Sequence, residues 1–226
     1  MKRNKLLALT ATSVLATLGA CTPALAARVT VRVEGLNKTL LAPTVLSTKS
    51  GWITKDGVPA GECPASSANG ALDVATDHHW NGIWYSSFSE YLITSIFGEH
   101  YTSSSNDYWS LWVNDRFASL GACEIKLHHG DQLLFAVEGL KTAYPIAIEG
   151  PSKVAAGHSI KLKVVYYDAA GHTKPLAGAH VRAGALKFVT DAHGSVKVAT
   201  HSTGAFRFTA DHTGYIRSAP LVVVVS

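Results

Sequence analysis

The chain has 226 residues and a formal net charge of +4, from 20 Lys and Arg against 16 Asp and Glu. Three of the positive side chains lie in the first five positions, which leaves 17 positive against 16 negative, a balance of +1. Nothing in the sequence suggests a nucleic-acid-binding surface, which would need a clustered basic face. The low charged fraction of 16%, with many Ser, Thr and Gly, is typical of an exported β-rich protein.

The first 26 residues have the pattern of a secretory signal peptide. A basic start at residues 2–5 precedes an apolar segment, residues 6–20, that is too short to span a bilayer comfortably. Residues 24–26 (ALA) form a small-residue cleavage site, so we predict a mature chain that starts at Ala27. Alternatively, the sequence Leu-Gly-Ala-Cys that ends at Cys21 is similar to a bacterial lipobox, and lipidation of Cys21 would tether the protein to a membrane. No later stretch is long and apolar enough for a membrane helix.

Two cysteines, Cys63 and Cys123, remain once Cys21 is removed or lipidated. An even pair in an oxidising compartment predicts a disulfide. Closing a loop of about 60 residues would contribute about 4 kcal/mol in the chain-entropy account. The alternative is a pair of buried free thiols. No metal site is predicted there, because no further ligands cluster at a matching spacing.

Residues 29–137 predict a small sheet with one helix. Val29, Val31 and Val33 alternate with polar residues, as in a half-buried strand. Pro43 restricts the next strand to an edge or a break. A serine cap and a stripe of Ala and Leu predict a short helix. In chain order the expected elements are strands 29–34 and 39–48, a loop 51–64, a helix from 66 or 67 to 76, an aromatic connector 77–87 with a turn at Asn81-Gly82, and strands 88–97, 108–113 and 132–137.

Alternation along residues 108–114 separates two faces of the central strand. Trp109, Leu111 and Val113 are assigned to the core. The other face carries Tyr108, Ser110, Trp112 and Asn114 and is expected to be partly open, with a turn following at Asn114-Asp115.

Three segments of this half resemble the transcobalamin C-terminal-like domains of bacterial secreted proteins. They are YLITSIFG (91–98), YWSLWVN (108–114) and GDQLLF (130–135). The resemblance covers about half of the chain and implies a ubiquitin-like β-grasp fold in an extracytoplasmic protein. The Cys63 and Cys123 pair is similar to that of actinobacterial members. In animal cobalamin carriers the related domain closes over the corrin ligand.

From residue 145 the composition changes to short alternating strands without Trp or Cys. Seven strands are expected, at 146–149, 159–167, 180–182, 186–190, 195–200, 205–210 and 221–225. Many short strands with regular turns predict an antiparallel sandwich. The pieces PLAGAHV (175–181), TDAHG (190–194) and ADHTGYIRS (210–218) resemble bacterial Ig-like or carboxypeptidase-regulatory-like repeats. We therefore predict a mainly β chain: a signal peptide (1–26), an α+β β-grasp-like domain with one short helix (27–138), a linker (139–144) and an antiparallel Ig-like β-sandwich (145–226).

Aromatic side chains supply the candidate ligand site. We expect Trp84, Tyr85 and Trp112 to line a surface groove, with Tyr108 and Asn114 beside it, because aromatic faces with amide and hydroxyl groups suit planar or sugar-like ligands. The alternative is that the tryptophans only fill a small core around the disulfide.

Catalytic signatures are missing from the sequence: there is no G-x-S-x-G, no phosphate-binding P-loop and no metal motif among the 11 His residues. We expect no enzyme and no cofactor, but a secreted or cell-surface binding or adhesion module whose partner is an unknown small molecule, glycan or protein. A cobalamin-type carrier and a purely structural stalk remain the alternatives.

Overall fold

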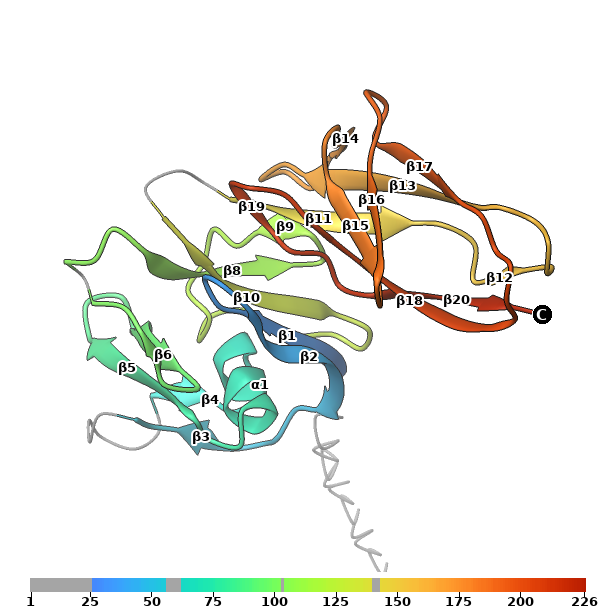
Figure 1. Ribbon diagram of the computed structural model, residues 1–226. Helices are drawn as coiled ribbons and strands as arrows, with labels where there is room; N and C mark the ends of the chain where they lie inside the picture. The colour runs from blue at the N-terminus through green and yellow to red at the C-terminus, as the bar shows by residue number, and fades with distance from the viewer. Residues whose placement is uncertain (1–25, 56–61, 103, 140–142) are drawn as a thin grey trace, which may run out of the picture.

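The computed structural model describes residues 26–55, 62–102, 104–139 and 143–226 (Figure 1). The predicted lipidation site Cys21 and the signal peptide before Ala26 lie outside the described residues. We call residues 26–139 the N-terminal half and residues 143–226 the C-terminal half. The predicted fold class is confirmed, because the described chain is mainly β with one short helix. The β-grasp and Ig-like assignments, and the domain boundaries, stay predictions.

A mixed five-stranded sheet forms the centre of the N-terminal half. Its order is β2 (Thr39–Ser47), β1 (Arg28–Glu34), β10 (Gln132–Glu138), β8 (Tyr108–Val113) and β9 (Arg116–Phe117). Strands β1 and β10 run parallel, and the other neighbours are antiparallel. Pro43 lies in the edge strand β2, as predicted, where its missing N–H interrupts no inner ladder.

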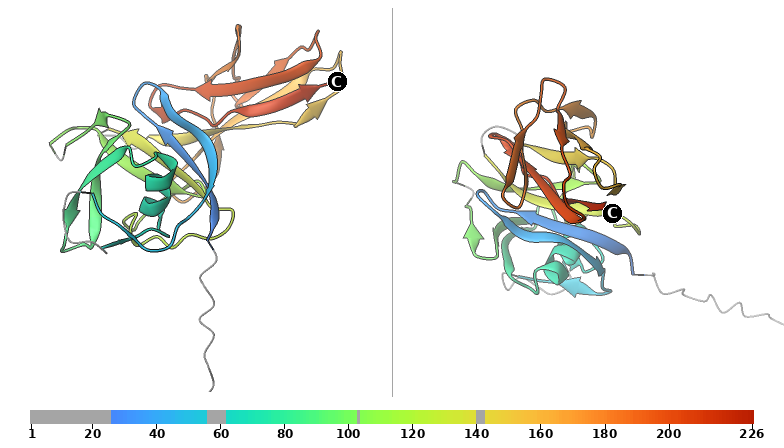
Figure 2. Two further views of the ribbon diagram at one scale, coloured as in Figure 1. Left: turned by 90° about the horizontal axis from the view of Figure 1, so that it is seen from below. Right: turned by 45° about the vertical axis from the view of Figure 1, so that its right-hand side comes forward.

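Helix α1 (Ala68–Ala75) lies against one face of this sheet (Figures 1 and 2). The Ser67 hydroxyl caps it by accepting a hydrogen bond from the Gly70 N–H at 3.2 Å, which confirms the predicted serine cap. Asp77 and His78 adopt positive φ angles of 48° and 65°, and so they end the helix and redirect the chain.

The prediction of a connector at 77–87 is wrong over most of its length. Residues 80–85 form β5 (Trp80–Tyr85), which pairs with β6 (Glu90–Ile96), and β6 pairs with β7 (Glu99–His100). Asn81-Gly82, a common turn pair, instead lies at a register shift in the β5–β6 ladder. A Cβ on Gly82 would come within 2.9 Å of the Leu92 carbonyl oxygen, so glycine at this position allows β5 and β6 to approach each other closely. A two-stranded ladder of β3 (Trp52–Ile53) and β4 (Cys63–Pro64) completes this half.

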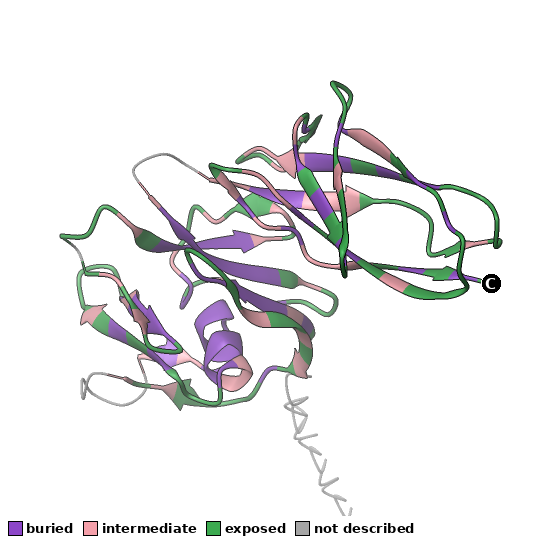
Figure 3. Cartoon of the chain, in the orientation of Figure 1, coloured by how far each residue is buried: buried purple, intermediate pink, exposed green. Residues whose placement is uncertain are grey.

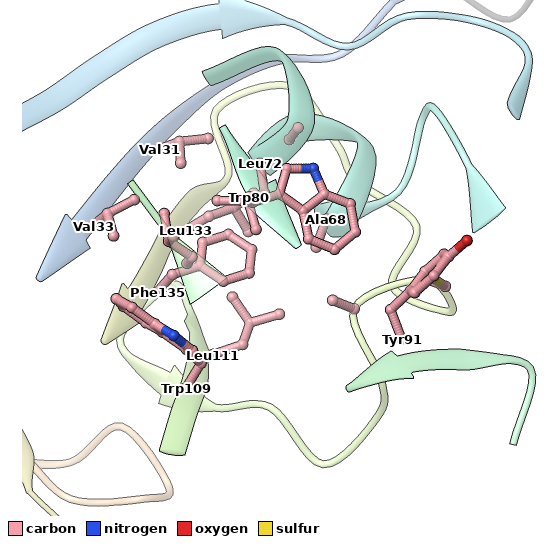
Figure 4. Close-up of a cluster of buried hydrophobic side chains, with 14 of the residues drawn as sticks. Val31, Val33, Ala68, Leu72, Trp80, Tyr91, Trp109, Leu111, Leu133 and Phe135 are labelled. Atoms are coloured by element: carbon pink, nitrogen blue, oxygen red, sulfur yellow. The ribbon is translucent and has the colours of Figure 1, made fainter. Parts of the chain in front are cut away.

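The core of the N-terminal half fills the space between the sheet, α1 and the β5–β6 hairpin (Figure 4). Strands β1 and β10 contribute Val31 and Phe135, α1 contributes Leu72 and β5 contributes Trp80, all at 2% exposure or less. Trp109 of β8 joins them, which confirms its predicted core assignment. Each such side chain contributes about 1.5–3 kcal/mol on burial.

Two five-stranded sheets make up the C-terminal half. One contains β14 (Thr173–Pro175), β13 (Ile160–Tyr167), β11 (Tyr144–Glu149) and β19 (Tyr215–Ile216), with β17 (Ser195–Val198) also on β13; the other is ordered β12 (Lys153–Val154), β20 (Leu221–Val225), β18 (Gly204–Asp211), β15 (His180–Ala183) and β16 (Leu186–Val189). All seven predicted strands are confirmed, and β11 already begins at Tyr144. Apolar side chains from both sheets, among them Phe208 and Ile160, form a separate buried cluster.

The C-terminal half packs against the sheet face opposite α1 (Figures 1 and 3). Trp112, Leu134 and Ala136 of that face form a buried cluster with Ile216 of the C-terminal half. Tyr144 adds an edge-to-face contact with Trp112, with ring centroids 6.2 Å apart. The five-stranded sheet is therefore covered on both faces.

A polar network closes one side of this junction. Arg217 of the C-terminal half donates from Nε to the Glu34 carboxylate at 3.1 Å and from Nη1 to the Leu36 carbonyl oxygen at 3.2 Å. Arg32 donates in the other direction, from Nη1 to the Arg217 carbonyl oxygen at 2.9 Å. Burial raises the pKa of the Glu34 carboxyl, although both arginines oppose that shift. The two halves are joined through charges as well as through apolar contact.

Candidate functional site

Trp112 is not exposed, so it does not line a surface groove as predicted, although Tyr108 and Asn114 at the ends of the same strand face are exposed. The Trp112 side chain is 1% exposed because Tyr144 and Ile216 cover it from the C-terminal half. The indole Nε1 donates to the buried Glu138 carboxylate at 2.9 Å, which satisfies both groups. Trp84 belongs to the opposite side of the sheet, where it packs against the core of the N-terminal half. The structure therefore does not bring Trp84 and Trp112 into one groove.

Tyr108 and Asn114 lie at the two ends of β8 and have identifiable structural partners. Tyr108 is 40% exposed, and its hydroxyl donates to Glu138 at 3.4 Å. Burial, followed by the Glu138 charge, raises the pKa of Tyr108. Asn114 has a φ of 50°, and its side chain bonds to Asp131 at 2.8 Å and to the Gln132 N–H at 2.9 Å. These contacts hold the predicted turn, a common use of Asn at positive φ.

Tyr85 is the predicted site residue that borders an apolar surface hollow. It lies at the end of β5, is 39% exposed, and borders a mainly apolar hollow of about 320 Å³ with Phe88, Glu90, Tyr91 and Leu92. We call this hollow the hairpin groove. Trp84 supports it from beneath, since its ring meets Tyr91 edge-on with centroids 4.9 Å apart.

A second hollow, of about 480 Å³, shares Phe88 and Glu90 with the hairpin groove. Its other lining residues are Ser87, Ser119, Leu120, Gly121 and Glu124. Phe88 is 68% exposed and Leu120 is 58% exposed, which is unusual for side chains of this size beside a concave surface. Apolar faces thus adjoin hydroxyl and carboxylate groups over a continuous stretch of surface.

Glu90 is the polar centre of this surface. One carboxylate oxygen accepts the Cys123 N–H at 2.8 Å, and the other accepts the Tyr91 N–H at 3.0 Å. Burial raises the pKa of Glu90, while these main-chain N–H groups act in the opposite direction. A Cβ on Gly121 would collide with this carboxylate, so a side chain there would displace Glu90 from its present position. A carboxylate has about four lone-pair sites, so acceptor capacity remains for a ligand.

The disulfide holds the Glu90-binding loop in place. Cys63 and Cys123 are bonded, as predicted, with Cα atoms 5.2 Å apart. The loop also bonds to the start of α1, since the Asn69 N–H donates to the Ala122 carbonyl oxygen at 3.1 Å. The floor of the hairpin groove is therefore fixed by covalent and main-chain links.

Asp73 is a buried polar residue that sequence reasoning missed. It accepts hydrogen bonds from Trp80 Nε1 at 2.8 Å and pairs with His78 Nδ1 at 2.7 Å and Lys55 Nζ at 3.3 Å. The sequence did place Asp73 on the buried side of a short amphipathic helix. That position predicts polar partners, because a buried carboxylate must be hydrogen-bonded or paired. These contacts join α1 to β5 behind the groove.

Among the described residues, no group of three or more His, Cys, Asp or Glu side chains could hold a metal ion. Within the same part of the chain, no helix is long and apolar enough to cross a membrane.

Comparisons with known proteins match parts of the chain. Residues 71–139 match the family described as "Domain of unknown function (DUF4430)". Except for its last two residues, this region lies within residues 29–137, which carry the predicted transcobalamin-like resemblance. No curated protein matches the chain.

Two solved structures align with half of the chain. One is a protein of Ruminococcus gnavus ATCC 29149, described provisionally as metal-binding, with 13% identity and a TM-score of 0.35 over 50% of this chain and 97% of that one. The other is haptocorrin in complex with Cbi, with 19% identity and a TM-score of 0.36 over 50% of this chain and 25% of that one. At these TM-scores, neither alignment establishes a fold or a function.

Proposed function

We propose that the protein is a non-catalytic binding module, exported from the cell, whose hairpin groove binds a saccharide. The observation that carries this proposal is the position of Tyr85 and Phe88, two exposed aromatic rings beside the Glu90 carboxylate. The C–H face of a sugar ring packs on such rings, while its hydroxyl groups donate charge-assisted hydrogen bonds to a carboxylate.

Rigidity of the groove supports a binding role. Glu90 is already oriented by two main-chain N–H groups, and the adjoining loop is held by the disulfide. A preorganised site loses little conformational entropy when the ligand binds. The C-terminal half would then act as a spacer that carries the groove away from the cell.

Export is supported by the disulfide, since such bonds persist in oxidising compartments. Intact mass of the exported protein would distinguish cleavage after Ala26 from lipidation at Cys21.

A glycan array probed with the mature chain tests the proposal. We expect saturable binding to at least one saccharide, weakened about tenfold or more by Tyr85→Ala and by Phe88→Ala, because each removes one stacking surface. Both positions are exposed, so the fold should tolerate them. Leu186→Ala, which removes an exposed apolar side chain of the C-terminal half, is the matched control and should bind normally.

Three results would contradict the proposal. A silent array would favour the structural stalk. A copurified corrin, visible by its absorbance, would favour the cobalamin-type carrier. Saccharide binding that survives both aromatic substitutions would place the site elsewhere on the protein.

A further inference from the structure

A different hollow lies in the junction between the two halves and is separate from the hairpin groove and from the hollow that adjoins it. Its volume is about 290 Å³. The N-terminal half contributes Arg32, Trp112 and Asp115 to its wall, and the C-terminal half contributes Ile148, Tyr167 and Leu221. We call it the junction cavity. Neither half alone contains it.

Arg32 brings unused hydrogen-bond donors to this cavity. Its side chain comes from β1 and is 8% exposed, and burial lowers the pKa of its guanidinium. Only Nη1 has partners, the Arg217 carbonyl oxygen at 2.9 Å and Glu34 at 3.4 Å. Within the described part of the chain, neither Nε nor Nη2 makes a hydrogen bond. A guanidinium carries five N–H donors, so most of this buried group's capacity is free for an anionic partner.

Asp115 brings the opposite charge. It lies in the turn between β8 and β9 with a φ of 62°, and the Tyr167 hydroxyl interacts with its carboxyl group. Burial raises the pKa of Asp115, while Arg32 opposes that shift. No ion pair within 4 Å joins Arg32 to Asp115 among the described residues, although both line the same cavity. The two charges thus face the hollow without neutralising each other directly.

We propose that the junction cavity binds a free α-amino acid with an apolar side chain. The ligand carboxylate pairs with Arg32, and its ammonium group pairs with Asp115. Arg32 is already paired with Glu34 through Nη1, so the ligand carboxylate would use its remaining donors; a ligand with only one charge would leave either these donors or the Asp115 carboxylate without a charged partner in the cavity. The apolar part of the ligand packs against Trp112, Ile148 and Leu221.

The size of the cavity agrees with this class of ligand. Sites for drug-sized molecules span about 300–1,000 Å³, so a hollow of about 290 Å³ suits a molecule of amino-acid size and is too small for a corrin. Because the wall comes from both halves, the bound amino acid would also strengthen the junction between them.

Thermal unfolding and calorimetry of the mature full chain test the inference. The probes are valine, leucine, isoleucine, methionine and phenylalanine. For leucine, isopentylamine lacks the carboxylate and 4-methylpentanoate lacks the ammonium group. We expect at least one amino acid to raise the melting temperature at about 10 mM, and removal of either charge to weaken binding about tenfold or more.

Substitutions distinguish binding in the junction cavity from nonspecific stabilisation by the added amino acids. Asp115→Asn should weaken amino-acid binding about tenfold or more and leave 4-methylpentanoate binding nearly unchanged, since only the ammonium contact is lost. Arg32→Lys should weaken the binding of both leucine and 4-methylpentanoate. If Arg32→Lys does not fold, Tyr167→Phe is a milder second variant: it removes the hydroxyl that interacts with Asp115 and should weaken leucine binding. Asp77→Asn makes the same chemical change at an exposed position that also has a positive φ, and it should bind like the original protein.

The inference is overturned if none of the five amino acids shifts the melting temperature, if either singly charged analogue binds as well as leucine, or if Asp115→Asn binds as well as Asp77→Asn. Saccharide binding at the hairpin groove involves none of these residues, so this test and the previous one fail independently.

Discussion

Arg217→Met should weaken the junction between the two halves. The change removes hydrogen bonds to Glu34 and to the carbonyl oxygens of Gly35 and Leu36. Three bonds at about 1 kcal/mol each give a loss of about 3 kcal/mol. The side chain of Arg217 is 26% exposed, so water can replace some of the lost hydrogen bonds. We therefore expect a net loss of about 2–3 kcal/mol in the free energy of unfolding at neutral pH.

The loss should depend on pH in a defined direction. Burial raises the pKa of Glu34 above its ordinary value of 4.5, and Arg217 limits that rise. An acid whose pKa is raised by folding binds protons more readily in the folded state. Its contribution to stability therefore falls as the pH rises from the unfolded pKa to the folded pKa. Removing Arg217 raises the folded pKa further. The variant should therefore lose more stability at about pH 7.5 than at about pH 3.5, where Glu34 is largely protonated in both states.

Urea unfolding followed by tryptophan fluorescence provides the measurement. All five Trp residues precede residue 113, so the signal reports on the N-terminal half, which carries Glu34. The control is Arg182→Met, which breaks a more exposed ion pair with Asp211 inside the C-terminal half and should cost less than about 1 kcal/mol. Equal losses for the two variants, or a loss for Arg217→Met that does not grow with pH, would refute the reasoning.

Gly121→Ala should destabilise the protein by about 1–3 kcal/mol, because its Cβ meets the Glu90 carboxylate. In thermal unfolding, combining it with Glu90→Ala should cost less than the sum of the single changes; strict additivity would mean that the collision does not occur. Replacing both Cys63 and Cys123 with Ser should cost about 4 kcal/mol through the freed loop, and a reducing agent should lower the melting temperature of the original protein but not of this variant. An unchanged melting temperature after both substitutions would show that the disulfide does not stabilise the N-terminal half.

Local patterns were sufficient to predict most elements. The seven strands of the C-terminal half follow from two-residue alternation and turn residues, and the helix follows from the Ser67 cap. These signals act over a few residues, so they can be recognised without knowledge of the tertiary structure. Strand β5 was missed because Asn81-Gly82 usually makes a turn, whereas here cross-strand pairing with β6 overrides that preference.

The candidate site was harder to predict because it depends on which surfaces meet. Alternation correctly placed Trp109 and Trp112 on opposite faces of β8, but it cannot show that the C-terminal half covers the second face. The neighbouring strand did contain a signal: residues 133–137 (LLFAV) are apolar at every position, a pattern of strands buried on both faces. Phe88, predicted as the start of a strand, instead lies in the turn between β5 and β6, where its exposure depends on tertiary structure.

Coverage of the sheet on both faces limits how the chain can be divided. A fragment that ended at Glu138 would keep its helix and disulfide but would present Trp112, Leu134 and Ala136 to water. It would also leave the Glu34 carboxylate without its arginine from the other half. Such a fragment should self-associate through the uncovered strands, so the two halves should be expressed and crystallised together.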